Sequence, residues 1–92
     1  MCDLFVRIQA EDYDAWLRVH SELAPYRREY GIEDGPLYRG IDDPETAIFH
    51  ARVEDVDRAM QWFRSDTLRE ASPRATVTGR TYFLDEPHDP GA

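Results

Sequence analysis

The sequence predicts an α+β fold, in which strands and helices follow one another in the order βαββαβ. Two segments, 12–31 and 54–66, repeat apolar residues every three or four positions, as amphipathic helices do. Strand-like alternation of apolar and polar residues marks four further segments, at 3–9, 36–41, 46–53 and 76–86. Because crossover connections are right-handed, the economical arrangement is a four-stranded antiparallel sheet with both helices on one face, a ferredoxin-like fold.

The first helix is amphipathic and contains its own break. Asp12 is a typical N-cap, and Gly31 is where we expect the helix to end. Pro25 has no backbone N–H and crowds the carbonyl of Ser21, so the helix should kink or end a first segment there. One stripe of this helix faces inward, and it contains Tyr13, Trp16, Leu17, His20, Leu23, Ala24 and Arg27.

The later elements are predicted from turn and capping residues. Pro44, in the stretch "DDPE", occupies the turn that joins two strands into a hairpin. After the second helix, the capping-box spacing of Thr67 and Glu70 indicates one further helical turn, which Pro73 should end. Trp62 falls outside the apolar arc of the second helix, and no role is predicted for it.

The sheet is expected to bury one face under the helices and to leave the other bare. The predicted helix side carries Leu4, Val6, Ile8, Leu37, Phe49, Ala51 and Val53. The predicted bare side carries Phe5, Tyr38, Ile48, Tyr82 and Leu84, interleaved with Arg7, His50, Arg52 and Arg80. Such a face is too apolar for water alone and too polar for a closed core, which suits a subunit interface. We therefore predict a homodimer formed sheet to sheet.

Size and charge restrict the classes of partner. One domain is expected at residues 1–86, followed by a flexible C-terminal tail at 87–92. The net charge of −8 repels phosphate backbones and anionic lipids, so nucleic acid and membranes are not expected partners. The chain has no run of membrane-spanning length, and its single cysteine cannot form an internal disulfide, so a cytoplasmic protein is expected.

Metal and cofactor motifs are absent from the sequence. Its three histidines, His20, His50 and His88, do not have the spacing of metal ligands. The chain also has no phosphate-binding glycine loop, no dinucleotide fingerprint and no serine elbow. We therefore expect no metal, nucleotide or flavin.

Three stretches of the sequence carry a resemblance to a known family. They are "EDYDAW" at the start of the first helix, "YRGIDDPETAIFHARVEDVDRAMQWF" across the hairpin and second helix, and "SDTLREASPRATVTGR" before the last strand. With these, residues 3–86 resemble the dimeric α/β-barrel superfamily, and within it the antibiotic-biosynthesis-monooxygenase-like (ABM-like) group. The resemblance implies a dimeric α/β barrel with a ligand cavity in each subunit, between the helices and the sheet.

The same resemblance implies a range of activities. Members of the group include cofactor-independent oxygenases of aromatic polyketides, polyketide cyclases, lactone isomerases and haem-degrading oxygenases. The haem-degrading branch uses an asparagine on the first strand, a tryptophan on the third and a histidine on the second helix. This chain has none of these, and its third strand carries Phe49 instead, so haem is not expected.

His20 is the candidate catalytic residue, and Trp16 and Arg27 are candidate substrate-binding residues. A buried histidine with one hydrogen-bond partner is common, so a purely structural role for His20 stays open. Two basic groups and a tryptophan on one inward stripe are nevertheless costly to bury without water, which favours a polar cavity. With an ordinary pKa of about 6.5, His20 would serve as a general base, while Trp16 stacks on an aromatic ring and Arg27 holds a carboxylate or enolate oxygen.

Tyr13 and His50 are further candidates for substrate binding. Tyr13 could donate a phenolic hydrogen bond to a ligand, but core packing is the favoured interpretation. His50 should face the partner subunit with Arg52, and it would enter the cavity only if a bulge shifted the strand by one residue.

Two hypotheses of function follow, and the sequence leaves open whether the protein is an enzyme. The first is a small cofactor-independent monooxygenase or polyketide cyclase that acts on an aromatic or polyketide-derived compound. The second is a non-catalytic small-molecule-binding or accessory dimer that uses the same cavity. The same base would serve either chemistry of the first hypothesis, so the sequence does not separate an oxygenase from a cyclase.

Overall fold

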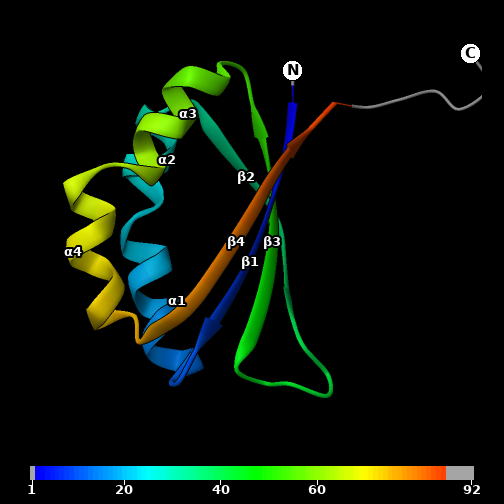
Figure 1. The fold of residues 1–92 in the computed structure, drawn as a ribbon, viewed down its shortest axis with the longest axis vertical. Coiled ribbons are helices and arrows are strands. Elements are labelled where there is room, and N and C mark those ends of the chain that lie inside the picture. Colours follow the sequence, from blue (N-terminus) through cyan, green and yellow to red (C-terminus); the bar gives the residue numbers. More distant parts are fainter. Residues whose placement is uncertain (1, 87–92) are drawn as a thin grey trace, which may run out of the picture.

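Four antiparallel strands form one sheet in the computed structural model, which describes residues 2–86 (Figure 1). The strands are β1 (Cys2–Ala10), β2 (Ile32–Arg39), β3 (Thr46–Val53) and β4 (Val77–Asp85), and their order across the sheet is β2-β3-β1-β4. The first and third strands of the chain are therefore central. The predicted tail at 87–92, with His88, lies outside the described residues.

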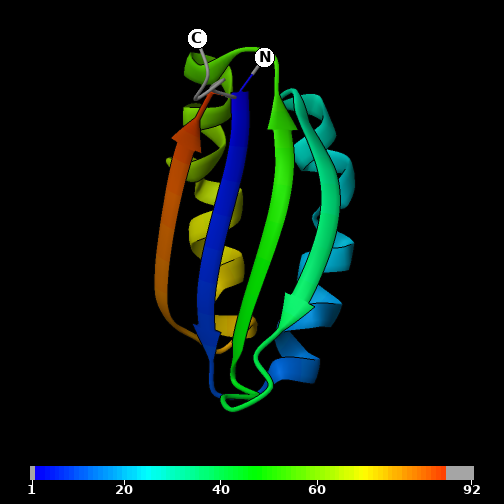
Figure 2. The ribbon, with the colours of Figure 1, turned by 90° about the vertical axis from the view of Figure 1, so that its right-hand side faces the viewer.

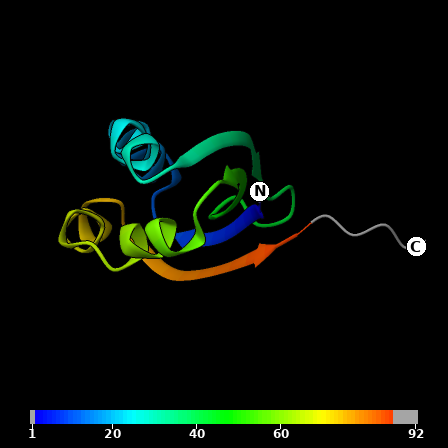
Figure 3. The same ribbon diagram turned by 90° about the horizontal axis from the view of Figure 1, so that it is seen from above.

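Within residues 2–86, four helical segments cover one face of this sheet. They are α1 (Tyr13–Glu22), α2 (Ala24–Glu29), α3 (Val56–Phe63) and α4 (Asp66–Arg74). Figure 2 views the opposite, open face, and Figure 3 shows the helices and the sheet as two layers. The predicted ferredoxin-like fold is confirmed. No helix in the described part of the chain is long and apolar enough to cross a membrane.

The first helix breaks where proline was expected to break it. The Asp12 side chain accepts a hydrogen bond from the backbone N–H of Ala15 at 3.1 Å and caps α1. Leu23 ends α1 and precedes α2, and Pro25 lies in the first turn of α2, where its missing N–H leaves no bond unmade. Gly31 then ends the helical region with a φ of 76°, a conformation that glycine adopts without strain.

The last helix is longer than the sequence predicted. Its cap is Ser65, whose side chain accepts from the N–H of Leu68 at 3.3 Å, rather than the expected Thr67. Pro73 lies inside α4, one residue before its end, instead of terminating a single turn. Proline is tolerated there because only one main-chain hydrogen bond is lost near an end that frays in any case.

β2 begins at Ile32, earlier than the predicted strand at 36, and it contains a bulge. Asp34 pairs with Ala51 and Leu37 pairs with Phe49, so three steps along β2 match two along β3. The extra residue keeps both Asp34 and Leu37 on the helix side of the sheet. Because β2 is an edge strand, Leu37 is nevertheless 37% exposed.

The face assignment is confirmed for the two central strands and was wrong for β4. The predicted helix-side residues of β1 and β3 are buried: Leu4, Val6, Ile8, Phe49, Ala51 and Val53. However, β4 pairs Leu84 with Leu4, Tyr82 with Val6 and Arg80 with Ile8, which places all three on the helix side. Large side chains occur at both the odd and the even positions of β4, so alternation alone does not identify the buried face. A shift of one residue exchanges the two faces.

Gly35, within the β2 bulge, allows a close approach to His50. A Cβ at position 35 would lie 2.9 Å from the His50 carbonyl oxygen and 2.9 Å from its Nδ1. Gly35→Ala should therefore lower the free energy of unfolding by about 1–3 kcal/mol, because backbone atoms must move apart. Urea denaturation measures this loss. Gly79→Ala is the control, since its Cβ would meet only Gln9 at 3.9 Å, and equal stability of the two variants would contradict the close packing.

Candidate functional site

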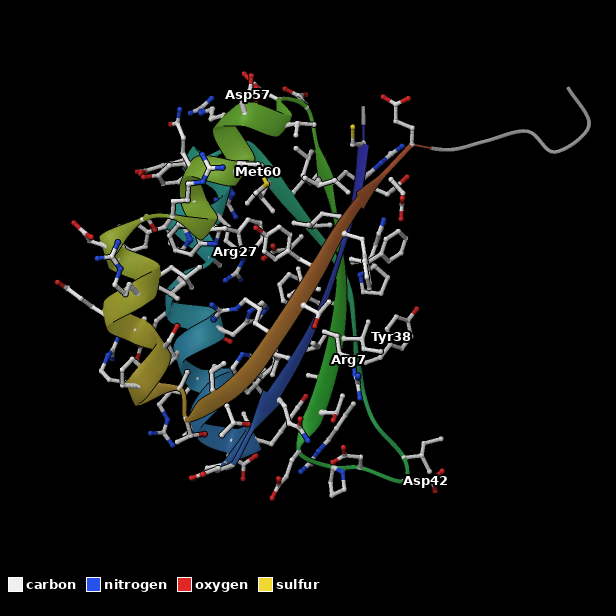
Figure 4. The ribbon with its side chains drawn as sticks, in the orientation of Figure 1. Arg7, Arg27, Tyr38, Asp42, Asp57 and Met60 are labelled. Atoms are coloured by element: carbon white, nitrogen blue, oxygen red, sulfur yellow. The ribbon has the colours of Figure 1, made fainter. Side chains whose placement is uncertain are left out.

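A small cavity lies between the helices and the sheet. Its volume is about 40 Å³, which is room for roughly three water molecules. Trp16, His20 and Arg27 line it together with apolar residues of β1, β3, α3 and α4. Figure 4 shows Arg27 on the helix side of the sheet, whereas Arg7 and Tyr38 extend from the open side. The inward stripe of the first helix therefore meets a cavity, as predicted.

Aromatic rings hold the His20 imidazole in place. It stacks on Trp16, one helical turn away, with ring centroids 4.7 Å apart and planes 22° apart. Phe49 of β3 meets it from the sheet side at 4.8 Å. These contacts occur because residues 16 and 20 share one helix face, and that face lies over the central strands. The ring is thus fixed between a helix and the sheet.

An ion pair between the buried Arg27 and the partly exposed Asp34 lies behind His20. Arg27 is 4% exposed, and its Nε and Nη2 each donate to one carboxylate oxygen of Asp34 at 2.9 Å. The same Nη2 lies 3.4 Å from Nε2 of His20. A guanidinium is stable in such a position only when its charge is matched and its donors are used. Asp34 therefore completes the site, and the sequence reasoning missed it.

The break in the helix brings the Arg27 side chain within reach of His20. In an uninterrupted helix, Arg27 would lie about 10 Å beyond His20 along the axis. Here Arg27 belongs to α2 and its side chain reaches back to the ring on α1. The signal for Asp34 was an acidic residue soon after Gly31, at the start of a strand that follows an inward arginine.

Burial, followed by the positive charge of Arg27, lowers the pKa of His20 from 6.5 to about 4, and Asp34 opposes this only partly. His20 is therefore neutral at neutral pH. Since Arg27 only donates, Nε2 of the neutral ring accepts and Nδ1 carries the hydrogen. The ordinary pKa assumed from the sequence was wrong, because the desolvating rings and Arg27 act together.

Tyr13 and His50 do not line the cavity. The Tyr13 ring packs 5.7 Å from Trp16 and carries the Arg39 guanidinium 4.0 Å above its centroid. His50 lies on the open face of the sheet. Its Nε2 is 2.7 Å from the Asp3 carboxylate, in the geometry of a side-chain hydrogen bond. Their roles in substrate binding stay predictions, and neither residue contacts the cavity in this arrangement.

Two further residues, which the sequence reasoning did not select for the site, also line the cavity. Arg80 of β4 lines the cavity, and its Nη2 donates to Ser72 Oγ of α4 at 3.2 Å. Trp62 also lines the cavity and is 3% exposed, because the rings of Tyr26 and Tyr30 pack on it. The helical periodicity of α3 alone does not reveal this burial, since the covering residues come from the preceding helical region.

Among residues 2–86 no group of three or more His, Cys, Asp or Glu side chains has a metal-binding arrangement. The expectations of no metal, no cofactor, no nucleic-acid partner and a cytoplasmic location stay predictions.

Comparisons with known proteins show which solved structures share this fold. No family profile and no curated protein sequence matches the chain. A structure from Bordetella bronchiseptica, provisionally described as an antibiotic biosynthesis monooxygenase, superposes with a TM-score of 0.77 at 14% identity, covering 95% of this chain and 96% of its own. A variant of SnoaB from Streptomyces nogalater, described as a cofactor-independent oxygenase, superposes with a TM-score of 0.73 at 14% identity, covering 96% and 93%.

The chain has the fold of the antibiotic biosynthesis monooxygenases. The resemblance predicted from the sequence is thus confirmed at the level of the fold. An uncharacterised NIPSNAP domain protein from Burkholderia xenovorans also superposes, with a TM-score of 0.66 at 12% identity, over 96% of this chain and 95% of its own. Because proteins of different description share this fold, function has to be argued from the cavity and its residues.

Stability should depend on pH through His20. Its folded pKa lies below the usual value, so between about pH 4 and 6.5 the unfolded chain binds a proton that the folded chain does not. Stability is therefore retained above this window and is lost as the pH falls through it, by up to about 3 kcal/mol. Urea denaturation of the parent and of His20→Gln at several pH values isolates the contribution of His20. The other titrating groups cancel in the difference between the two free energies of unfolding. Parallel pH profiles would contradict it.

Proposed function

We propose that this protein is a small enzyme of the cofactor-independent monooxygenase type, acting on an aromatic or polyketide-derived small molecule in the cavity beside α1. One observation carries the proposal: a neutral imidazole, His20, is held rigidly at the wall of a mostly apolar cavity by Trp16, Phe49 and the Arg27–Asp34 pair. A fixed, neutral base in an apolar cavity is what proton abstraction from a carbon acid requires. The fold shared with SnoaB supports it.

The chemistry begins with proton removal. His20 takes a proton from an activated CH₂ or a phenol of the substrate, and the resulting anion is electron-rich enough to reduce O₂. For a CH₂ group, one oxygen atom becomes the carbonyl oxygen and the other leaves as water with both hydrogens, so no external reductant is needed. Nε2 accepts the proton, because Nδ1 already carries one, and the proton of the substrate replaces the long 3.4 Å contact from Arg27. The same base would serve the aldol step of a cyclase.

The residues around the cavity have different roles in this reaction. Arg27 already binds Asp34 through two nitrogens, so we assign it the positioning of His20 and not the binding of a substrate anion. Asp34 partly offsets the charge that forms when His20 is protonated. Trp16 supplies an aromatic wall. Arg80 is then the cation on the cavity wall that stabilises a developing enolate oxygen.

Oxygen uptake tests the enzymatic proposal. A panel of hydroxylated aromatic compounds, from one ring to four, should include at least one that consumes O₂ without added flavin, metal or haem. His20→Gln should then lower kcat by about 100-fold or more, the usual contribution of a general base. Arg18→Gln is the control, because Arg18 is exposed on the same helix and outside the cavity. Uptake unchanged in His20→Gln would remove His20 from the mechanism.

The second candidate is a non-catalytic binding protein, and one observation favours it. Nε2 of His20 is already engaged by Arg27, and the pKa of about 4 makes the imidazole a weaker base than an ordinary histidine. Binding of a panel compound, measured by calorimetry, without O₂ uptake or product formation would select this candidate over the enzyme.

We also propose that two copies associate through the open faces of their sheets. That face exposes large apolar side chains, among them Phe5 at 38%, Ile48 at 42% and Phe83 at 52%. They project from adjacent strands, since Phe5 pairs with Phe83 and Ile48 with Arg7. Several exposed large apolar side chains on one sheet face suit a subunit interface, and a second copy of the same face would bury them.

Light scattering tests the dimer. The parent protein should have twice the chain mass at micromolar concentration, and Ile48→Glu should have the monomer mass, because a charge would be buried in the interface. Ile41→Glu is a matched control, since Ile41 is 98% exposed in the loop between β2 and β3. A monomeric parent protein, or an equal effect of both substitutions, would remove this proposal.

A further inference from the structure

We propose that the ligand of the cavity is a compact anion, a carboxylate carried on a single ring, and that Arg80 binds its charge. The inference rests on the proposed function in that both place the ligand in the same cavity. It narrows the substrate class in two respects, size and charge, which have independent structural support.

The first support is the way in which Arg80 is held. Its pairing with Ile8 puts the side chain on the helix side of β4. From the opposite side, Ser72 Oγ accepts a hydrogen bond from its Nη2 at 3.2 Å. Ser72 is itself fixed, because its hydroxyl donates to the Leu68 carbonyl of α4 at 2.9 Å. The guanidinium is therefore oriented by both layers of the fold, and Ser72 acts as a positioning residue.

The second support is the charge balance of the cavity wall. Two arginines line the cavity, and Asp34 matches the charge of Arg27 at 2.9 Å. Within residues 2–86, no carboxylate lies within ion-pair distance of Arg80. The guanidinium keeps its charge at neutral pH, and Ser72 engages only one of its five N–H donors. A carboxylate, which takes two parallel N–H bonds from a guanidinium, complements this group best.

The third support is the size of the cavity. Its volume of about 40 Å³ is well below the 300–1,000 Å³ typical of drug-sized ligand sites. Small residues line the cavity on the helix side, Ala71 of α4 and Ala75 at its C-cap, and Val6 and Ile8 of β1 line it on the sheet side. Small adjustments of side chains admit one ring. A fused-ring system would require α4 to move away from the sheet.

The apolar part of the ligand also has a defined environment. Phe63 lines the cavity and stacks on Tyr82 at 4.3 Å with planes 8° apart, so an aromatic wall stands beside Arg80 on the same face of β4. A ring that extends from a carboxylate on Arg80 would enter between this wall and the apolar residues of β1. Charge at the wall and apolar surface inside predict an amphiphilic ligand.

Calorimetry with a graded series of ligands tests the proposal. Benzoate should bind at least about tenfold more tightly than benzamide, its neutral analogue of the same shape. It should exceed anthracene-2-carboxylate, which carries the same charge on three fused rings, by the same factor. Indole N–H chemical shifts report whether the ligand enters, because Trp16 and Trp62, the two tryptophans of the chain, both line the cavity.

Variants separate the charge from the size. Arg80→Gln should bring benzoate and benzamide to within about twofold of each other, while Arg80→Lys retains part of the preference. Arg74→Gln is the control, because Arg74 is an exposed arginine of α4 that pairs with Glu22 outside the cavity. Thermal unfolding of each variant verifies that it folds; Arg80 is exposed on its outer side, so its replacement should leave the melting temperature close to that of the parent.

Three results would overturn the inference: no binding of benzoate, equal or tighter binding of the three-ring carboxylate, or an unchanged preference for the anion in Arg80→Gln. None of them decides the proposed function, which depends on O₂ uptake. A neutral polycyclic compound that is oxidised would leave the monooxygenase proposal standing and remove the compact anion. A monocyclic carboxylate that binds without turnover would leave the compact anion standing and remove the monooxygenase proposal.

Discussion

The site depends on the burial of one arginine. Arg27 lies under the helices with its charge matched by Asp34, and this pair joins α2 to the edge strand β2. Removing Asp34, whose side chain is 38% exposed, would leave the charge of buried Arg27 uncompensated inside the fold and destabilise it. Arg27 also meets the His20 ring, and after burial its charge is the second cause that lowers the pKa of the imidazole.

The two faces of the sheet serve different purposes for a common reason. Four helical segments cover one side, and the small residues Ala71 and Ala75 leave room there for a cavity. The other side has no covering layer among the described residues, although its strands carry aromatic and aliphatic side chains. A short chain that builds only one layer of helices leaves the second face uncovered, and this open face is the one through which we propose that two copies associate.

The similarity to known structures shows the fold, but it does not by itself identify the reaction. Proteins described as monooxygenases and a NIPSNAP domain protein superpose on the same elements at identities of 12–14%. The cavity of this chain is lined by a histidine that is neutral at neutral pH and by Arg80, which has no carboxylate partner within residues 2–86. These residues favour a small anionic ligand and a reaction that begins with proton transfer.

The sequence by itself determined the order of elements, the break near Pro25, the stop at Gly31 and the inward stripe with Trp16 and His20, because these depend on local backbone preferences and on periodicity. Only the tertiary structure decided which residues meet that stripe. Asp34 reaches Arg27 through a bulge in an edge strand, and Arg80 faces the helices through the register of β4. Alternation shows that a strand has two faces, but pairing with distant strands selects the buried one.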